Sequence, residues 1–172
     1  MATFGNAGNF DTGMWLYNAC MGVFTLSESG YVSKITAGCV VPGGGTCNAK
    51  AFIYDDDGSG SAPGTLKGVT AVTELSGAVE MWYDFTFASA VSLTSGNWYL
   101  GVVRDTEGSS SVLHNTDTTA TYYYGEISYS SPESPCPALT YDDSREFCIY
   151  ATYTDEGSGI SIPLLNHLLL GD

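Results

Sequence analysis

Basic residues are scarce in this sequence: five Lys and Arg stand against 19 Asp and Glu, which gives a formal net charge of −14. A surface of that sign repels phosphate backbones and anionic membranes, so it argues against nucleic-acid binding. It is compatible with a divalent cation or a basic partner, and it also keeps a protein soluble.

Long hydrophobic runs are missing as well. No segment approaches the ~20 apolar residues that a membrane span needs. The opening MATFGNAGNFDTG has neither the basic n-region nor the apolar h-region of a secretory signal peptide. We therefore expect no membrane span, and either an export signal that lies elsewhere or no export by that route.

Residue sets for catalysis and metal binding are sparse. The sequence has no G-x-S-x-G and no Cys-x-x-Cys, and His114 and His167 lie at no ligand spacing from the cysteines. Carboxylate pairs of the glycosidase type meet only in space, and 19 acids supply coincidental pairs in any fold. The sequence therefore predicts neither an enzyme, a zinc site nor a cofactor.

Glycine and aromatic residues are abundant instead. The 172 residues include 21 Gly and are 44% hydrophobic and 13% aromatic, but 14% charged. This length suits one domain, and the composition excludes wholesale disorder and favours a turn-rich β fold.

The stretch 79–103 (VEMWYDFTFASAVSLTSGNWYLGVV) carries the clearest strand pattern. Apolar residues occupy its odd positions from 79 to 87 and polar residues most of the even ones, so the period is two. Trp82 breaks the polar face, which indicates that another element covers it or that a partner contacts it. The Gly-Asn turn at 96–97 and the apolar run 98–103 then predict a central hairpin.

Further strands are predicted on both sides, with turn signals every ~8–12 residues and no clear helix. They cover residues 14–26, 31–41, 49–54, 66–75, 119–125 and 146–153. The predicted fold is all-β, a single antiparallel β-sandwich of jelly-roll type. Its predicted parts are an N-terminal arm or first edge strand (1–13), the sandwich (14–154), and a linker with an apolar C-terminal assembly peptide (155–172).

Five cysteines are present: Cys20, Cys39, Cys47, Cys136 and Cys148. Cys39 and Cys47 bracket VVPGGGT, and Cys136 and Cys148 bracket a similar excursion, so each pair is suited to close a local loop. We predict these two disulfides with Cys20 free, while other pairings stay open. Such bonds would place the protein in an oxidising compartment outside a cytosol.

One acidic segment has the spacing of a calcium loop. Asp55, Asp57 and Ser59 match its opening D-x-D-x-S, in which alternating oxygens surround a hard cation. The match then ends, because Leu66 stands where a bidentate Glu would close the loop. We predict an acidic hairpin tip facing water, with calcium here, or more weakly at 142–143, as the alternative.

The C-terminal segment differs from the rest. TDEGSG is a linker, and ISIPLLNHLLLGD is an apolar peptide too short to span a bilayer. Exposed leucines on a flexible linker favour aggregation, so we expect the peptide to pack on its own sandwich or, as we favour, on a neighbouring subunit. The predicted assembly contacts are Ile160, Ile162, Pro163, Leu164, Leu165, Leu168, Leu169 and Leu170.

Aromatic side chains suggest one more kind of contact. Tyrosines gather between residues 122 and 129, and Trp15, Trp82 and Trp98 lie elsewhere. Flat rings stack on sugars, although strand alternation predicts core or cross-strand packing for half of these residues. We expect packing for most of them and name Trp82 and Tyr123 as the possible glycan contacts.

Four strand-plus-turn segments carry a resemblance: FTLSESGYVSKITA (24–37), AFIYDDDGSGSAPGTL (51–66), YDFTFASAVSLTSGNWYLGVV (83–103) and YDDSREFCIYATY (141–153). The pattern resembles a family of small β-sandwich modules of bacteriophage virion proteins and of secreted or surface proteins of bacteria and archaea. The resemblance implies a sandwich displayed on an exterior surface as a decoration, fibre, adhesin or sugar-binding module. It carries over no catalytic residues.

We therefore expect a non-catalytic structural subunit of a virion exterior or extracellular filament, most specifically a phage capsid decoration or fibre protein. Its terminal segments would dock on other copies of itself or on a capsid or filament protein. The alternative is a carbohydrate-binding or adhesin module of a secreted protein, located extracellularly. That alternative predicts an exposed aromatic row and glycan binding by a monomer that lacks the tail.

Overall fold

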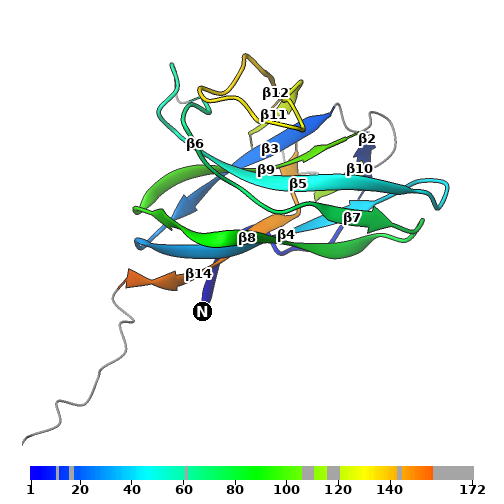
Figure 1. Cartoon of the computed structure of the whole chain (residues 1–172), viewed down its shortest axis with the longest axis horizontal. Helices are drawn as coiled ribbons and strands as arrows, with labels where there is room; N and C mark the ends of the chain where they lie inside the picture. Colours follow the sequence, from blue (N-terminus) through cyan, green and yellow to red (C-terminus); the bar gives the residue numbers. More distant parts are fainter. Residues whose placement is uncertain are drawn as a thin grey trace, which may run out of the picture.

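The computed structural model describes residues 1–10, 12–15, 18–60, 62–105, 111–115, 121–142 and 145–156, and for 12–15, 111–115 and 142 it describes the backbone alone. The fourteen elements assigned there are all strands, and they form two antiparallel sheets (Figure 1). In this part of the chain no helix has the length and hydrophobicity to cross a membrane. The all-β prediction is therefore confirmed.

Sheet A is built around the long strand β4. The seven strands of sheet A are β1 (Ala2–Gly5), β2 (Thr12–Trp15), β4 (Gly30–Val40), β8 (Met81–Leu93), β10 (Ser111–Asn115), β13 (Glu146–Phe147) and β14 (Ile149–Asp155). β8 pairs with one edge of β4, and β14 and β10 share the other edge. β1 pairs with β14 and β2 with β10, so the N-terminal residues are edge strands of the sandwich.

Sheet B is built around β9. The seven strands of sheet B are β3 (Ala19–Leu26), β5 (Thr46–Asp55), β6 (Leu66–Val69), β7 (Thr73–Ser76), β9 (Gly96–Arg104), β11 (Tyr122–Gly125) and β12 (Thr140–Asp142). β9 lies between β3 and β5; β6 and β7 pair with different parts of β5, and β11 and β12 continue the sheet beyond β3. The single strand predicted at 66–75 is thus two strands with a break at 70–72.

The main core lies between the two sheets. Alternation on β14 directs Ile149, Ala151 and Tyr153 into it, as the sequence predicts, and Phe147 of β13 joins them. On β4 the inward positions change from even to odd numbers, because the pairing register shifts between Val32 and Lys34. A β-bulge adds one residue and so inverts the facing of every later side chain.

The stretch 79–103 differs from its prediction in two ways. Val79 precedes β8 and is 73% exposed, and Met81 is also exposed, so the buried face of this strand begins only further on, with Phe85 fully buried. The predicted central hairpin is wrong. β8 pairs with β4 of sheet A, whereas β9 pairs with β3 and β5 of sheet B, so the turn carries the chain from one layer to the other.

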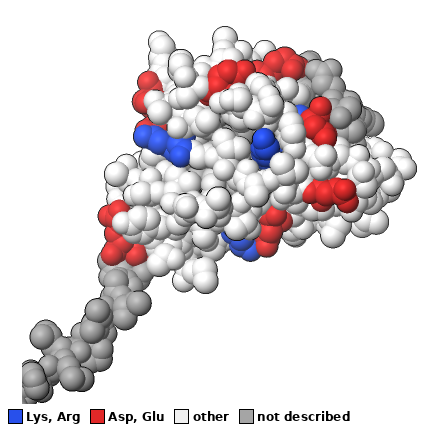
Figure 2. Space-filling model, viewed as in Figure 1, with Lys and Arg blue, Asp and Glu red and all other residues white. Residues whose placement is uncertain are grey.

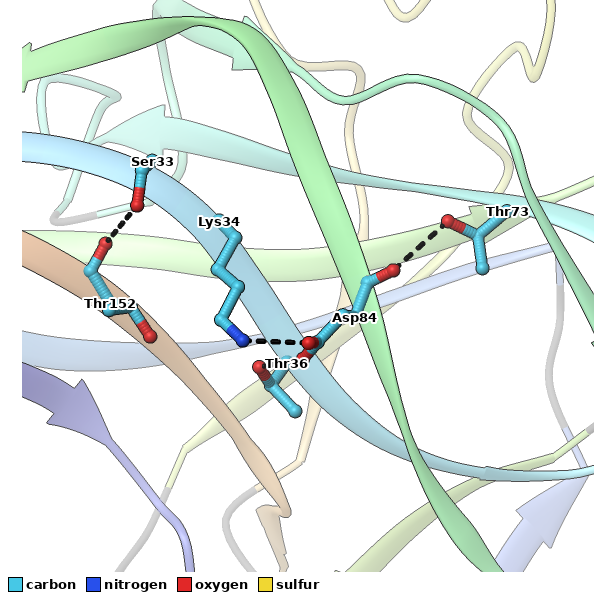
Figure 3. A network of polar contacts seen from close by, with 6 residues as sticks. All are labelled: Ser33, Lys34, Thr36, Thr73, Asp84 and Thr152. Carbon is cyan, nitrogen blue, oxygen red and sulfur yellow. Dashed lines mark hydrogen bonds and ion pairs between the residues drawn. The ribbon is translucent and has the colours of Figure 1, made fainter.

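A network of polar contacts links β14, β4 and β8 of sheet A, and Thr73 of sheet B donates to the Asp84 carbonyl of β8 (Figure 3). The Lys34 ammonium donates to Asp84 Oδ2 at 2.7 Å, and Thr36 Oγ1 donates to Asp84 Oδ1 at 2.6 Å. Because Lys34 and Thr36 hydrogen-bond to the carboxylate, they lower the pKa of Asp84. These contacts join β4 to β8.

Candidate functional site

The outer face of sheet B carries a second apolar cluster. Alternation on β9 sends Trp98, Leu100 and Val102 into the main core, and Tyr99 and Val103 to this outer face. Segment 126–139 folds over part of it, with Ile127 buried there. Segment 126–139 is tied down by Lys50 Nζ and by the Tyr54 hydroxyl, which donate to the backbone carbonyls of Tyr129 and Glu133.

Beside that cover, the outer face is hollowed. A depression of about 570 Å³, here named the tyrosine-lined depression, opens between β3, β9, β11, β12 and the loop after β5. Its volume lies within the ~300–1,000 Å³ of ordinary ligand sites. The lining residues are Val23, Asp56, Ser59, Gly60, Ala62, Asn97, Tyr99, Thr121, Tyr123 and Tyr141.

Four polar side chains of this depression, Asp56, Asn97, Tyr99 and Tyr123, form one hydrogen-bonded chain with the adjacent Thr25. Thr25 Oγ1 donates to Asn97 Oδ1 at 2.9 Å, and Asn97 Nδ2 donates to Asp56 Oδ2 at 3.3 Å. The Tyr99 hydroxyl hydrogen-bonds to the side chains of Tyr123 and Asp56. Asp56 Oδ1 is buried with no hydrogen-bond partner among the described residues, a feature that in native proteins calls for a functional or structural explanation.

Tyr99 is held in its neutral form. Desolvation is the largest cause that raises the pKa of its hydroxyl, and the neighbouring Tyr123 and Asp56 raise it further. A neutral phenol both donates and accepts hydrogen bonds. The polar chain therefore offers fixed donors and acceptors with one formal negative charge, on Asp56.

Two aromatic rings line the same depression as this polar chain. Tyr123 on β11 and Tyr141 on β12 are cross-strand neighbours whose ring centroids lie 6.3 Å apart, with 42° between the ring planes. Tyr141 is 67% exposed, which is unusual for a large aromatic side chain on a strand. On β11, Tyr122 and Tyr124 point to the opposite face from Tyr123 and pack with the main core. Alternation on β11 therefore leaves Tyr123 for the outer face.

A second depression adjoins the first. This proline-lined depression measures about 450 Å³. Tyr123, Ser59 and Ala62 line both depressions, so the two share a wall. The residues lining the second are Gly58, Ser59, Ala62, Pro63, Gly64, Tyr123, Pro135, Cys136, Pro137, Ala138 and Leu139.

Trp82 and Tyr123, named together from the sequence, lie on different sheets. Trp82 on β8 of sheet A packs against Phe10 and Tyr150, with ring centroids 4.9 and 5.4 Å away. Gly38 leaves the space that the Phe10 ring occupies. Trp82 is therefore partly covered by the N-terminal segment, and the structure brings Tyr123 together with Tyr141 instead.

The candidate calcium ligands are engaged within the protein. Asp55 forms an ion pair with Lys67 at 2.9 Å, and Asp57 accepts hydrogen bonds from the backbone N–H and hydroxyl of Thr65. Ser59 lines both depressions. Among the described residues no group of three or more His, Cys, Asp or Glu could hold a metal. The side chains at 142–143 lie outside the described part.

All five cysteines are free thiols, so both predicted disulfides are wrong. Cys39 and Cys47 lie on strands of opposite sheets within the main core, where they pack as small apolar side chains and not across a rim loop. Cys136 packs on the outer face of sheet B, whereas Cys148 lies between β13 and β14 of sheet A, with its thiol 3.7 Å from the Asn9 carbonyl. The argument for an oxidising compartment loses this support.

Sequence reasoning missed most of the site. Asp56, the β9 residues Asn97 and Tyr99, and Tyr141 come from three segments that meet only in the folded chain. Alternation along 98–103 was the one local signal, since it separates Tyr99 from the core residues on either side. The predicted assembly contacts from Ile160 to Leu170, together with His167, lie outside the described residues, as does the side chain of His114.

Charge is spread without a basic patch on the face that Figure 2 shows, where acidic side chains are scattered and basic ones are few. No family model matches the chain, and no curated protein matches its sequence.

Proposed function

We propose that this chain is a non-catalytic β-sandwich module that binds a neutral carbohydrate in the tyrosine-lined depression. The observation that carries the proposal is the exposed ring of Tyr141 beside Tyr123, in the same depression as the polar chain of Asp56, Asn97 and Tyr99. Aromatic rings match the C–H faces of sugars, and a few fixed polar groups match their hydroxyls.

Charge favours a neutral ligand. The chain has a net charge of −14, and no Lys or Arg is among the described residues that line the depression. An anionic sugar would meet Asp56 without a compensating cation. Glycans that carry sialic acid, uronic acid or phosphate should therefore bind more weakly than neutral ones.

The same set of residues supports binding and not hydrolysis. Glycosidases use two carboxyl groups on either side of the scissile bond, ~5–9.5 Å apart. Asp56 is the one carboxylate among the described residues that line the depression. Asp56 is also engaged by Asn97 and Tyr99, which suits a fixed acceptor.

Glycan-array screening of the full chain, followed by titration calorimetry of the best neutral hit, tests the proposal. Tyr141→Ala should weaken binding about tenfold, the size expected for a lost stacking ring. Tyr31→Ala is the matched control, because Tyr31 is 47% exposed and lies on sheet A. Silence of the array, or equal losses in both variants, would refute the proposal.

A second candidate role, compatible with the first, is a structural subunit of a virion exterior or extracellular filament. β1 and the end of β14 lie side by side in sheet A (Figure 1), with Ala2 opposite Tyr153. The tyrosine-lined depression is on the outer face of sheet B. Anchoring through the termini would thus leave the sugar site free. The resemblance to phage virion modules favours this second role. The role would place the chain on an exterior surface, as a sandwich with jelly-roll connectivity.

Light scattering at several concentrations tests the subunit role. The full chain should form higher species, and a chain that ends at Glu156 should be a folded monomer, because Glu156 N–H to the Ser29 carbonyl is the last described backbone hydrogen bond. Two monomers, or loss of the fold on truncation, would count against assembly through the tail. Glycan binding should survive the truncation.

A further inference from the structure

The two depressions on sheet B form a single site with two chemically different halves. Tyr123, Ser59 and Ala62 line both. The first half has aromatic rings and the hydrogen-bonded Asp56 and Asn97, whereas the second has prolines and aliphatic side chains. Each half, at about 570 and 450 Å³, is large enough for a ligand group of its own.

The proline-lined half is apolar in character. Its side chains include those of Pro63, Pro135, Pro137, Ala138 and Leu139, and its described lining residues contain the Cys136 thiol but no Asp, Glu, His, Lys or Arg. That thiol is neutral at physiological pH, because burial raises the pKa of Cys136 to about 12. Against the proline, alanine and leucine side chains a hydroxyl would lose hydrogen bonds to water and find few partners, because Ser59, Tyr123 and Cys136 carry the polar side-chain atoms of the described lining; a methyl group would lose no hydrogen bond.

The walls of this half are preformed by backbone hydrogen bonds. Gly58 N–H donates to the Ala62 carbonyl at 3.0 Å, which closes the loop on one side. Cys136 N–H donates to the Gly64 carbonyl at 2.7 Å, which holds segment 135–139 against that loop. A site that needs little ordering on binding keeps more of its contact energy as affinity.

We infer that the site takes an oligosaccharide of at least two units, one lying on Tyr141 and Tyr123 and the next placing a methyl-bearing substituent in the proline-lined half. Such a substituent is an N-acetyl group or the methyl of a 6-deoxy sugar; both present the same apolar group. This inference rests on the proposed carbohydrate binding and names its ligand class.

The experiment uses the full chain and pairs of neutral disaccharides of which one member carries this substituent and the other a hydroxyl. Such pairs are N,N′-diacetylchitobiose, which carries an N-acetyl group on both units, and cellobiose, or a 6-deoxy disaccharide and its hydroxylated counterpart. An array of one- to six-unit neutral glycans first selects the pair. By calorimetry the substituted member should bind at least about fourfold tighter, the gain expected from burying one methyl group. Equal or tighter binding of the unsubstituted member would overturn the inference.

Ala138→Glu locates the effect. Ala138 is exposed at the rim of the proline-lined half, so the substitution puts a charge there with little risk to the fold. It should abolish the preference between the paired sugars, so that both bind with the affinity of the unsubstituted member. Tyr141→Ala should instead weaken the binding of both sugars. Ala78→Glu adds the same charge at an exposed turn before β8 and should leave the preference intact.

The outcomes separate the two proposals. If no glycan binds, carbohydrate binding itself fails. If glycans bind through Tyr141 but Ala138→Glu leaves the preference unchanged, only the assignment of the proline-lined half fails. If a monosaccharide binds with the same affinity as a disaccharide, the inference of a two-unit ligand is likewise overturned.

Discussion

At the scale of single residues, Gly101 shows how tightly the outer face of sheet B is packed. A Cβ at this position would meet the Phe52 ring, and it would lie 2.7 Å from the Cys20 carbonyl oxygen. That oxygen belongs to the paired strand β3, so it has little freedom to withdraw. Phe52 and its neighbours support the floor on which Tyr99 sits.

We predict that Gly101→Ala destabilises the protein by about 1–3 kcal/mol, the usual cost of overpacking. The gain of about 0.5–1 kcal/mol that Ala often brings over Gly does not offset this. Urea unfolding measures the change. Gly45→Ala is the control, since a Cβ there meets nothing within 4 Å, and equal stability of the two variants would contradict the packing argument.

Asp84 gives a prediction on pH. The hydrogen bonds from Lys34 and Thr36 lower its pKa, so its contribution to stability is present above the unfolded pKa of ~3.9 and disappears as pH falls through the folded value. Its side chain is 54% exposed, so Asp84→Asn should lower the free energy of unfolding at pH 7 by less than about 1 kcal/mol.

Urea unfolding at pH 7, 5 and 3 measures this prediction. The difference between the Asp84→Asn variant and the original chain should shrink as the pH falls below about 4. Glu80→Gln, at an exposed carboxylate just before β8, controls for a general change in net charge. A difference for Asp84→Asn that stays constant across this range would contradict the role of the carboxylate.

At the scale of elements, the N-terminal strand both pairs and covers. β1 occupies the outer edge of β14 through four paired positions. Phe4 of β1 is 7% exposed in the main core, and Phe10 lies against Trp82 on the outer face of sheet A. Residues 1–10 therefore close an edge that could otherwise pair with another chain.

Deletion of residues 1–10 should destabilise the sandwich by about 3 kcal/mol or more, the cost of losing a buried Phe. It should also promote association through the free edge of β14. Thermal unfolding and light scattering measure the two effects. Removal of Met1 alone is the control, because Met1 is 99% exposed; an unchanged melting temperature after the longer deletion would show that the strand is dispensable.

At the scale of the whole molecule, the cysteines report on packing in both layers. Cys20, Cys39, Cys47 and Cys148 are buried, and Cys136 is partly exposed. Burial raises the pKa values of Cys20 and Cys39, and it raises that of Cys136 to about 12. Because the thiolate is the reactive form, all three should react slowly in the folded protein.

Alkylation with iodoacetamide, followed by mass spectrometry, tests the state of the thiols. Cys136 should be modified first and slowly in the folded chain, and the four buried thiols should stay unmodified. In denaturant without reductant all five should react, because all five are free. Fewer than five adducts under those conditions would reveal a disulfide and contradict the free-thiol core.

How much can be predicted from the sequence depends on how far apart in the chain the contacting residues lie. The inward face of 146–153 follows from strand alternation, a local property, and the structure confirms it. Tyr123 was named because a tyrosine run on a strand must send some rings outward. Trp82 also lies on the outward side of its strand, but there the ring of Phe10 packs against it, and Phe10 is far from Trp82 in the sequence.

The sequence by itself determined that the chain is all-β, because period-two patterns and turn residues act over a few neighbouring positions. Only the tertiary structure decided which strands pair, since β8 and β9 look like a hairpin and yet enter different sheets. It also decided that the thiols are not bonded to one another and that residues from Val23 to Tyr141 form one depression. These outcomes depend on packing between distant segments, and no local pattern in the sequence encodes that packing.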